Sequence, residues 1–131
     1  MHRDAGEPIE TVWAGRFIKA MTQGKWEFVG RNRGIEAAVI LAIDDADRVV
    51  LVEQYRVPLG RRCLELPAGL VGDEDADEPL LDAANRELEE ETGYRAAAVE
   101  PVGFFHSSPG MVTEGFTLVR ATGLEKVGPG G

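Results

Sequence analysis

Cysteine, long apolar runs and basic residues are all scarce in this sequence of 131 residues. The single cysteine, Cys63, cannot form an internal disulfide, which fits a reducing compartment. No apolar stretch approaches the roughly 20 residues that a membrane-spanning helix needs. The N-terminal segment MHRDAGEPIETVW also lacks the apolar core of a signal peptide. These absences predict a cytoplasmic protein without a membrane partner.

Basic residues are outnumbered by acidic ones, 14 Lys and Arg against 23 Asp and Glu, and the formal net charge is −9. No basic stripe is visible along the chain, so we expect no nucleic-acid partner. The acidic residues cluster at 73–78 and 87–91. Such clusters do not exclude a phosphate substrate, because metal ions can bridge the two sets of negative charge.

The remaining composition, 44% hydrophobic and 28% charged, is that of an ordinary globular domain with a real core. Strand-like segments are residues 11–19, 25–31, 35–43, 48–54, 63–66, 96–105 and 114–122. The first two flank a turn at 22–24 and predict a hairpin. The next two flank a turn at 44–47 and predict a second hairpin.

Residues 72–94, GDEDADEPLLDAANRELEEETGY, predict one amphipathic helix in their second half. Pro79 suits the first helical turn, and Gly93 suits the left-handed residue that follows a helix. An apolar stripe is formed by Leu80, Leu81, Ala84 and Leu88.

Beside that stripe, Glu87, Glu90 and Glu91 stand at helical spacing i, i+3 and i+4. Like charges at these positions weaken an isolated helix. A divalent cation is the simplest compensation, because carboxylate oxygens are hard ligands that suit Mg²⁺ or Mn²⁺. The alternative is an ordinary solvated face.

The helix and its flanks carry a more specific pattern. In order along the chain it consists of Gly72, Glu78, Arg86-Glu87-Leu88, Glu90-Glu91 and Gly93-Tyr94. This spacing resembles the Nudix box at every specified position. The segments QYR at 54–56, ELPAGL at 65–70 and SSPGMVTE at 107–114, with Pro109, resemble the ADP-ribose pyrophosphatase branch of that family. One departure is that the box spacing counts from Gly72 rather than Gly69, which predicts a three-residue insertion in the acidic loop.

The resemblance implies an α/β (α+β) Nudix fold, in which a mixed β-sheet core carries flanking helices as an α/β/α sandwich, plus N-terminal antiparallel strands. We expect residues 1–34 to form an N-terminal β extension for dimerisation and base recognition. Residues 35–131 then form the Nudix hydrolase domain, which we expect to be incomplete at its C-terminus. The resemblance also implies a homodimer.

By the same resemblance, Glu87, Glu90 and Glu91 are the catalytic residues and metal ligands, and the Ala68 carbonyl completes the coordination of Mg²⁺ or Mn²⁺. The alternative for Ala68 is a role in a tight turn only.

Glu78 and Arg86 stand about two helical turns apart. We interpret them as a structural ion pair that holds the acidic loop on the helix, and a substrate contact by Arg86 is the alternative.

Substrate contacts follow from the branch resemblance and from side-chain chemistry. The Arg56 guanidinium suits bidentate phosphate binding. Aromatic and arginine planes stack on adenine; strand packing is the alternative and is favoured for Phe28. Turn stabilisation is an equal alternative for the two serines. The predicted substrate-binding residues are Arg56, Ser107, Ser108, Glu114, Trp26 and Arg31.

The implied activity is metal-dependent hydrolysis of the pyrophosphate bond of ADP-ribose or a related ADP-sugar to AMP and a sugar phosphate. Two alternatives stay open. One is a Nudix hydrolase of another nucleoside diphosphate derivative, such as a GDP-sugar or a dinucleotide. The other is a weakly catalytic ADP-ribose-binding sensor.

Overall fold

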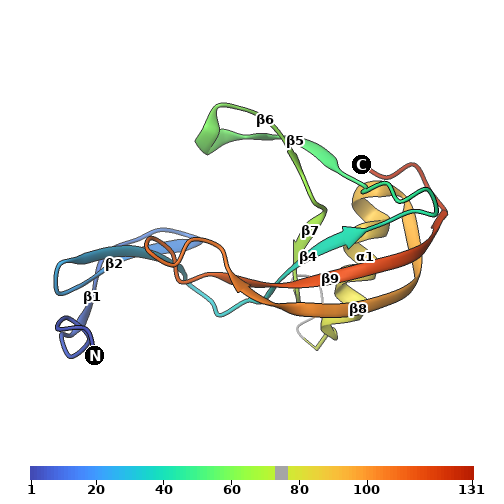
Figure 1. Ribbon diagram of the computed structural model, residues 1–131. Helices are drawn as coiled ribbons and strands as arrows, with labels where there is room; N and C mark the ends of the chain where they lie inside the picture. The colour runs from blue at the N-terminus through green and yellow to red at the C-terminus, as the bar shows by residue number, and fades with distance from the viewer. Residues whose placement is uncertain (73–76) are drawn as a thin grey trace. The chain divides into compact units, whose positions relative to one another are not determined.

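The computed structural model describes residues 1–72 and 77–131, which form two compact units (Figure 1). Unit 1 comprises residues 1–35 and 105–115, and unit 2 comprises residues 36–104 and 116–131. Unit 1 thus combines the N-terminal segment with a later loop. The predicted division of roles between residues 1–34 and 35–131 stays a prediction.

Unit 1 contains an antiparallel sheet of β1 (Ile9–Ala14), β2 (Ile18–Gln23) and β3 (Trp26–Arg31), in that order. The prediction of one strand over 11–19 is wrong, because the chain reverses at 15–17. There the Gly15 N–H donates to the Ile18 carbonyl at 2.8 Å. The later loop is tied to β3, since Val29 exchanges backbone hydrogen bonds of 2.9 Å with Met111 and Thr113.

Unit 2 is built on a four-stranded sheet in the order β7-β4-β9-β8. Its strands are β4 (Ala37–Ala42), β7 (Ala68–Leu70), β8 (Tyr94–His106) and β9 (Gly115–Lys126). Strand β4 pairs antiparallel with β7 and parallel with β9. The sheet is therefore mixed, as predicted.

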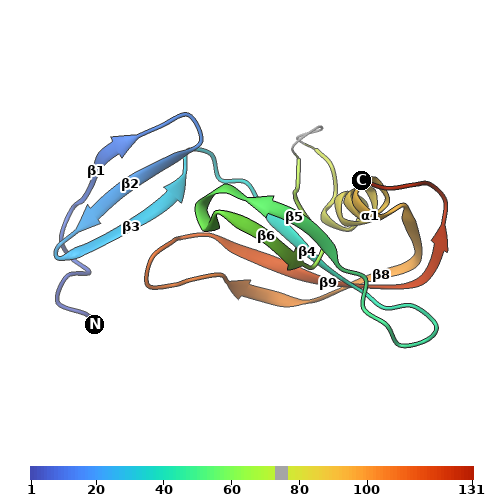
Figure 2. The same cartoon turned by 90° about the horizontal axis from the view of Figure 1, so that it is seen from above.

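Helix α1 (Leu80–Thr92) packs against this sheet (Figure 2). Pro79 precedes its first residue and Gly93 ends it with φ 77°. Its apolar stripe buries Ala84 and Leu88 against Ile40 of β4 and Val119 of β9. These findings confirm the mixed α+β fold class. Among residues 1–72 and 77–131, α1 is the one α-helix, so the described residues do not show the predicted α/β/α sandwich with helices on both faces of the sheet.

A separate two-stranded hairpin joins β5 (Val52–Arg56) to β6 (Arg61–Glu65) through a 3₁₀ turn, Val57–Leu59. The predicted hairpin between residues 35–43 and 48–54 is present only next to its turn, where Ile43 and Val49 form an antiparallel bridge. The prediction is wrong beyond that bridge, because β5 pairs with β6. The 3₁₀ turn and Gly60, with φ 63°, reverse the chain directly after Arg56.

The predicted insertion in the acidic loop involves residues 73–76, which lie outside the described residues. No described helix has the length and apolar character to cross a membrane.

Two glycines with positive φ offer a matched test of backbone packing. A Cβ at Gly93 would lie 2.1 Å from the Gly128 carbonyl oxygen, whereas a Cβ at Gly60 would meet open space. Gly60→Ala should lower the free energy of unfolding by about 1 kcal/mol, the cost of the left-handed backbone alone. Gly93→Ala should lower it by about 3 kcal/mol, because steric overlap adds to that cost. Denaturant titration measures both, and equal losses would contradict the close approach at Gly93.

Candidate active site

The acidic stripe of α1 begins with Glu87, whose side chain is 14% exposed. Glu87 lies over the backbone of β7: a Cβ at Gly69 would be 2.2 Å from the Glu87 Cδ. Any larger residue here would force the Glu87 side chain to move. The glycine of the PAG segment therefore forms a cradle for the first acid of the stripe.

Glu91 lies one turn further along α1 and accepts a hydrogen bond from the Ala68 N–H at 3.3 Å. Burial raises the pKa of the Glu91 carboxyl, and the negative charges of Glu87 and Glu65 raise it further. The Ala68 N–H and the Arg56 guanidinium act in the opposite direction. Glu91 is thus a part-buried acid for which additional positive charge would be favourable.

Arg86 binds three carboxylates at once. Its Nε and Nη2 donate to the two oxygens of Glu78 at 2.8 and 2.9 Å. Its Nη1 donates to Glu87 at 3.1 Å and to Glu90 at 3.2 Å. The hydrogen bonds from Arg86 lower the pKa of the Glu78 carboxyl. Arg86 therefore provides part of the positive charge that the sequence led us to expect from a metal ion alone.

The acidic stripe of α1 is the candidate site for a metal ion. Within residues 1–72 and 77–131, no three His, Cys, Asp or Glu side chains converge as a ready-made metal site. Glu87 and Glu90 instead accept hydrogen bonds from Arg86 Nη1. The chemistry of the donor set nevertheless fits a divalent cation, because carboxylate oxygens are hard ligands and Glu91 lacks full compensation. The Ala68 carbonyl as a ligand stays a prediction.

Arg56 of β5 is engaged by an acid that the sequence reasoning did not single out. Its Nε and Nη2 donate to the two oxygens of Glu65, both at 2.7 Å. This pair raises the pKa of Arg56 and lowers the pKa of Glu65. The sequence did offer one indication of a role for Glu65, because this residue is the first of the ELPAGL segment.

The remaining predicted substrate residues, Trp26, Arg31, Ser107, Ser108 and Glu114, belong to unit 1. Arg31 forms an ion pair with Glu114, and both side chains are about one-third exposed. The Ser108 carbonyl accepts hydrogen bonds from Met111 and Val112, so its backbone closes the turn. The structure thus gathers the predicted residues in two groups, one in each unit.

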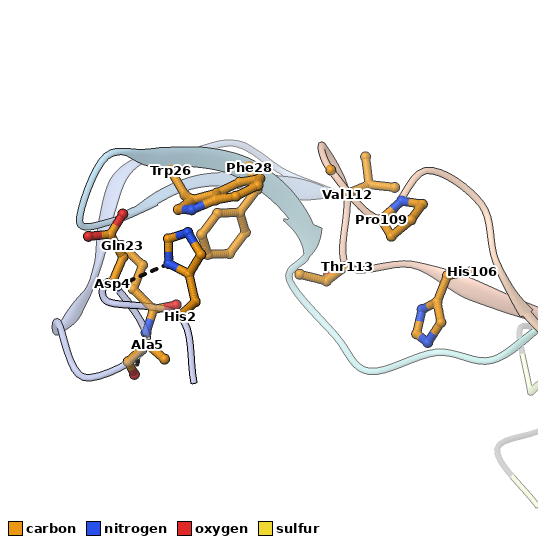
Figure 3. A pocket seen from close by; sticks show the side chains of 11 residues that line it. His2, Asp4, Ala5, Gln23, Trp26, Phe28, His106, Pro109, Val112 and Thr113 are labelled. Atoms are coloured by element: carbon orange, nitrogen blue, oxygen red, sulfur yellow. Dashed lines mark hydrogen bonds between the residues drawn. The ribbon is translucent and has the colours of Figure 1, made fainter.

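Unit 1 also contains a cavity of about 620 Å³ (Figure 3). Trp26 lines it together with Phe28, for which ordinary strand packing was favoured. The ring of His2 stands edge-on to Trp26, with ring centroids 5.8 Å apart. His106 and Pro109 contribute from the later loop. The sequence alone predicted Trp26 but not the rest of this lining, because the cavity forms where segments far apart in the sequence meet.

The raised pKa of Glu91 gives a pH-dependent prediction for the metal-free protein. Since the folded-state pKa lies above the ordinary value of 4.5, ionised Glu91 opposes folding above that raised pKa. The penalty disappears as the pH falls through the raised pKa toward 4.5. At pH 7 with chelator, Glu91→Gln should therefore raise the Tm by about 3 °C, and the gain should vanish at acidic pH.

Thermal unfolding of the parent and Glu91→Gln over a pH series measures this gain. Glu100→Gln, which removes an exposed acid paired with Arg120, is the matched control and should show no such trend. A Tm difference for Glu91→Gln that is independent of pH would contradict the electrostatic account.

The chain is similar in sequence to several known proteins. The methanol dehydrogenase activator of Bacillus methanolicus is 37% identical over 126 residues, covering 89% of this chain and 65% of that protein. An ADP-ribose pyrophosphatase of Mycobacterium tuberculosis is 42% identical over 92 residues, covering 70% of this chain and 44% of that protein. The chain spans less than two-thirds of the length of these curated relatives.

A solved structure described as an ADP compounds hydrolase superposes with a TM-score of 0.75 at 25% identity. The match covers 95% of this chain and 69% of that one. The NUDIX domain family matches residues 33–127, a range that includes α1 and every strand of the four-stranded sheet. This chain therefore belongs to the Nudix family.

Proposed function

We propose that this chain hydrolyses the pyrophosphate bond of ADP-ribose or a related ADP-sugar to AMP and a sugar phosphate. The observation that carries the proposal is the acidic stripe of Glu87, Glu90 and Glu91 on α1, beside the glycine cradle of β7. Relatives named ADP-ribose pyrophosphatase support the choice of substrate.

The three glutamates would hold Mg²⁺ or Mn²⁺. When bound, the divalent cation neutralises charge on the diphosphate oxygens and lowers the pKa of a coordinated water. Arg86 donates to Glu87 and Glu90 through Nη1, and to Glu78 through Nε and Nη2. Glu87 and Glu90 would leave Nη1 for the cation while the two bonds to Glu78 persist. That pair would keep the end of the acidic loop on α1 throughout turnover.

Hydrolysis adds one water across the P–O–P linkage: the water oxygen bonds to one phosphorus, and the bridging oxygen leaves with the other. The protein must hold the diphosphate in line for this displacement. Arg56 supports that role, because a guanidinium matches two phosphate oxygens at once.

The aromatic cavity of unit 1, taken by itself, suits a planar ring such as a nucleobase. Planar bases stack on aromatic faces, and Trp26 and Phe28 provide two of them. A volume of about 620 Å³ is within the usual range for small-molecule sites. Ser107, Ser108, Arg31 and Glu114 stay predicted substrate contacts, and the last two would exchange their mutual ion pair for the ligand.

We also propose a homodimer that forms through β1 in the cytoplasm. All six residues of β1 are exposed, including Ile9, Val12 and Trp13, which are 57–62% exposed. Apolar side chains at this density on an edge strand favour association with another chain. The single cysteine supports a reducing compartment.

Adjacent glutamates on α1 allow a controlled test of the catalytic stripe. Glu90→Gln should reduce turnover of ADP-ribose by about 100-fold, the scale of losing one group that organises a metal site. Glu89→Gln makes the same charge change one residue away, where the acid contacts only the exposed Arg95 among described residues. It should leave turnover unchanged.

The assay, with Mg²⁺ or Mn²⁺ present, follows by chromatography the AMP released from ADP-ribose and the GMP released from GDP-mannose. Equal loss in both variants, or full activity of Glu90→Gln, would contradict the role of the stripe. Hydrolysis of GDP-mannose but not ADP-ribose would show that the proposed substrate is wrong, while the proposed role of the acidic stripe would stand. Binding of ADP-ribose without AMP would favour the sensor.

A further inference from the structure

The β5–β6 hairpin carries two arginine–glutamate pairs, one on each face. In the register, Arg56 stands opposite Arg61, and Val52 stands opposite Glu65. Because alternate residues of a strand share a face, Arg56 and Glu65 lie on the same face. The second pair, Arg62 with Glu53, lies on the other face.

The Arg56–Glu65 pair is not formed by direct cross-strand neighbours. Glu65 is level with Val52, which precedes Arg56 by four residues, about 13 Å along a strand. The two hydrogen bonds of 2.7 Å therefore require the Arg56 side chain to run back along the hairpin face. It passes the level of Cys63, which stands between the two in the register.

This path brings the guanidinium to Glu65, which lies three residues before Ala68, and the Ala68 N–H donates to Glu91 of α1. The charges of Arg56 and Glu91 act on each other, each favouring the ionised form of its partner. Glu65 accepts from the Nε and Nη2 edge of the guanidinium. Among the described residues, the side-chain hydrogen bonds of Arg56 all go to Glu65, which leaves the Nη1 edge for a ligand.

We propose that Glu65 is a positioning residue that fixes Arg56 so that its Nη1 edge meets the diphosphate beside the acidic stripe of α1. A guanidinium held in place by one carboxylate loses little freedom when it binds a second anion. The proposal rests on the proposed function for the identity of the substrate. The hairpin geometry that supports it is independent of that function.

Glu65→Gln is the primary variant, and Glu53→Gln is its matched control. Both remove one acid and one arginine pair from the same hairpin, so a general loss of hairpin stability would affect both. With saturating Mg²⁺ and varied ADP-ribose, Glu65→Gln should raise KM about tenfold, the size of one charge-assisted contact. The kcat of Glu65→Gln should stay within about twofold, because ground-state binding is what changes. Glu53→Gln should match the parent.

Arg56→Ala supplies the test of mechanism. If Glu65 acts through Arg56, adding Glu65→Gln to Arg56→Ala should change KM no further. Equal effects of Glu65→Gln and Glu53→Gln, or a further tenfold rise in KM in the Arg56→Ala background, would overturn the proposal.

A measurement without turnover separates this proposal from the proposed function. The Arg56 Nε–H signal in ¹H–¹⁵N NMR spectra should be visible in the parent and in Glu53→Gln and lost in Glu65→Gln. Inorganic pyrophosphate with Mg²⁺ should bind Glu65→Gln about tenfold more weakly than the parent. If the parent hydrolyses no ADP-ribose, the proposed function fails, and these two measurements still decide the role of Glu65. An unchanged Arg56 signal or pyrophosphate affinity would overturn it.

Discussion

The interaction between the Arg86 guanidinium and three carboxylates underlies the rest of this site. Acids three and four residues apart on a helix repel each other, and α1 carries such a set in Glu87, Glu90 and Glu91. Arg86 compensates two of them through Nη1 and fastens Glu78 through its other edge. The third, Glu91, is left with the Ala68 N–H and the more distant charge of Arg56. In our account, a divalent cation completes this compensation.

Packing fixes where the acids point. Ala84 and Leu88 are buried against the sheet, so the neighbouring stripe of α1 has to face the edge strand β7. Gly69 lets Glu87 approach the β7 backbone, and Gly93 lets the chain after the helix pass close to its C-terminus. The same side chains that stabilise unit 2 therefore orient its chemistry.

The sequence predicted α1 well, because Pro79, Gly93 and the apolar stripe are all local signals. It failed at residues 11–19, where a reversal at Gly15 interrupts an otherwise strand-like composition. It also failed for the partner of β5, since two apolar segments around a turn look like a hairpin whichever strand they pair with. The contacts of Glu65 and the bonds from Arg86 to Glu87 and Glu90 depend on side-chain paths in three dimensions. The spacing of residues along the sequence does not predict such contacts.

We propose that the acids of α1 exchange Arg86 Nη1 for a divalent cation. The most direct measurement is anomalous X-ray diffraction from a crystal of this chain soaked in Mn²⁺. The account predicts an anomalous peak bounded by Glu87, Glu90 and Glu91, with Arg86 still bonded to Glu78. A peak elsewhere, or no peak while Glu87 and Glu90 remain on Arg86, would contradict it.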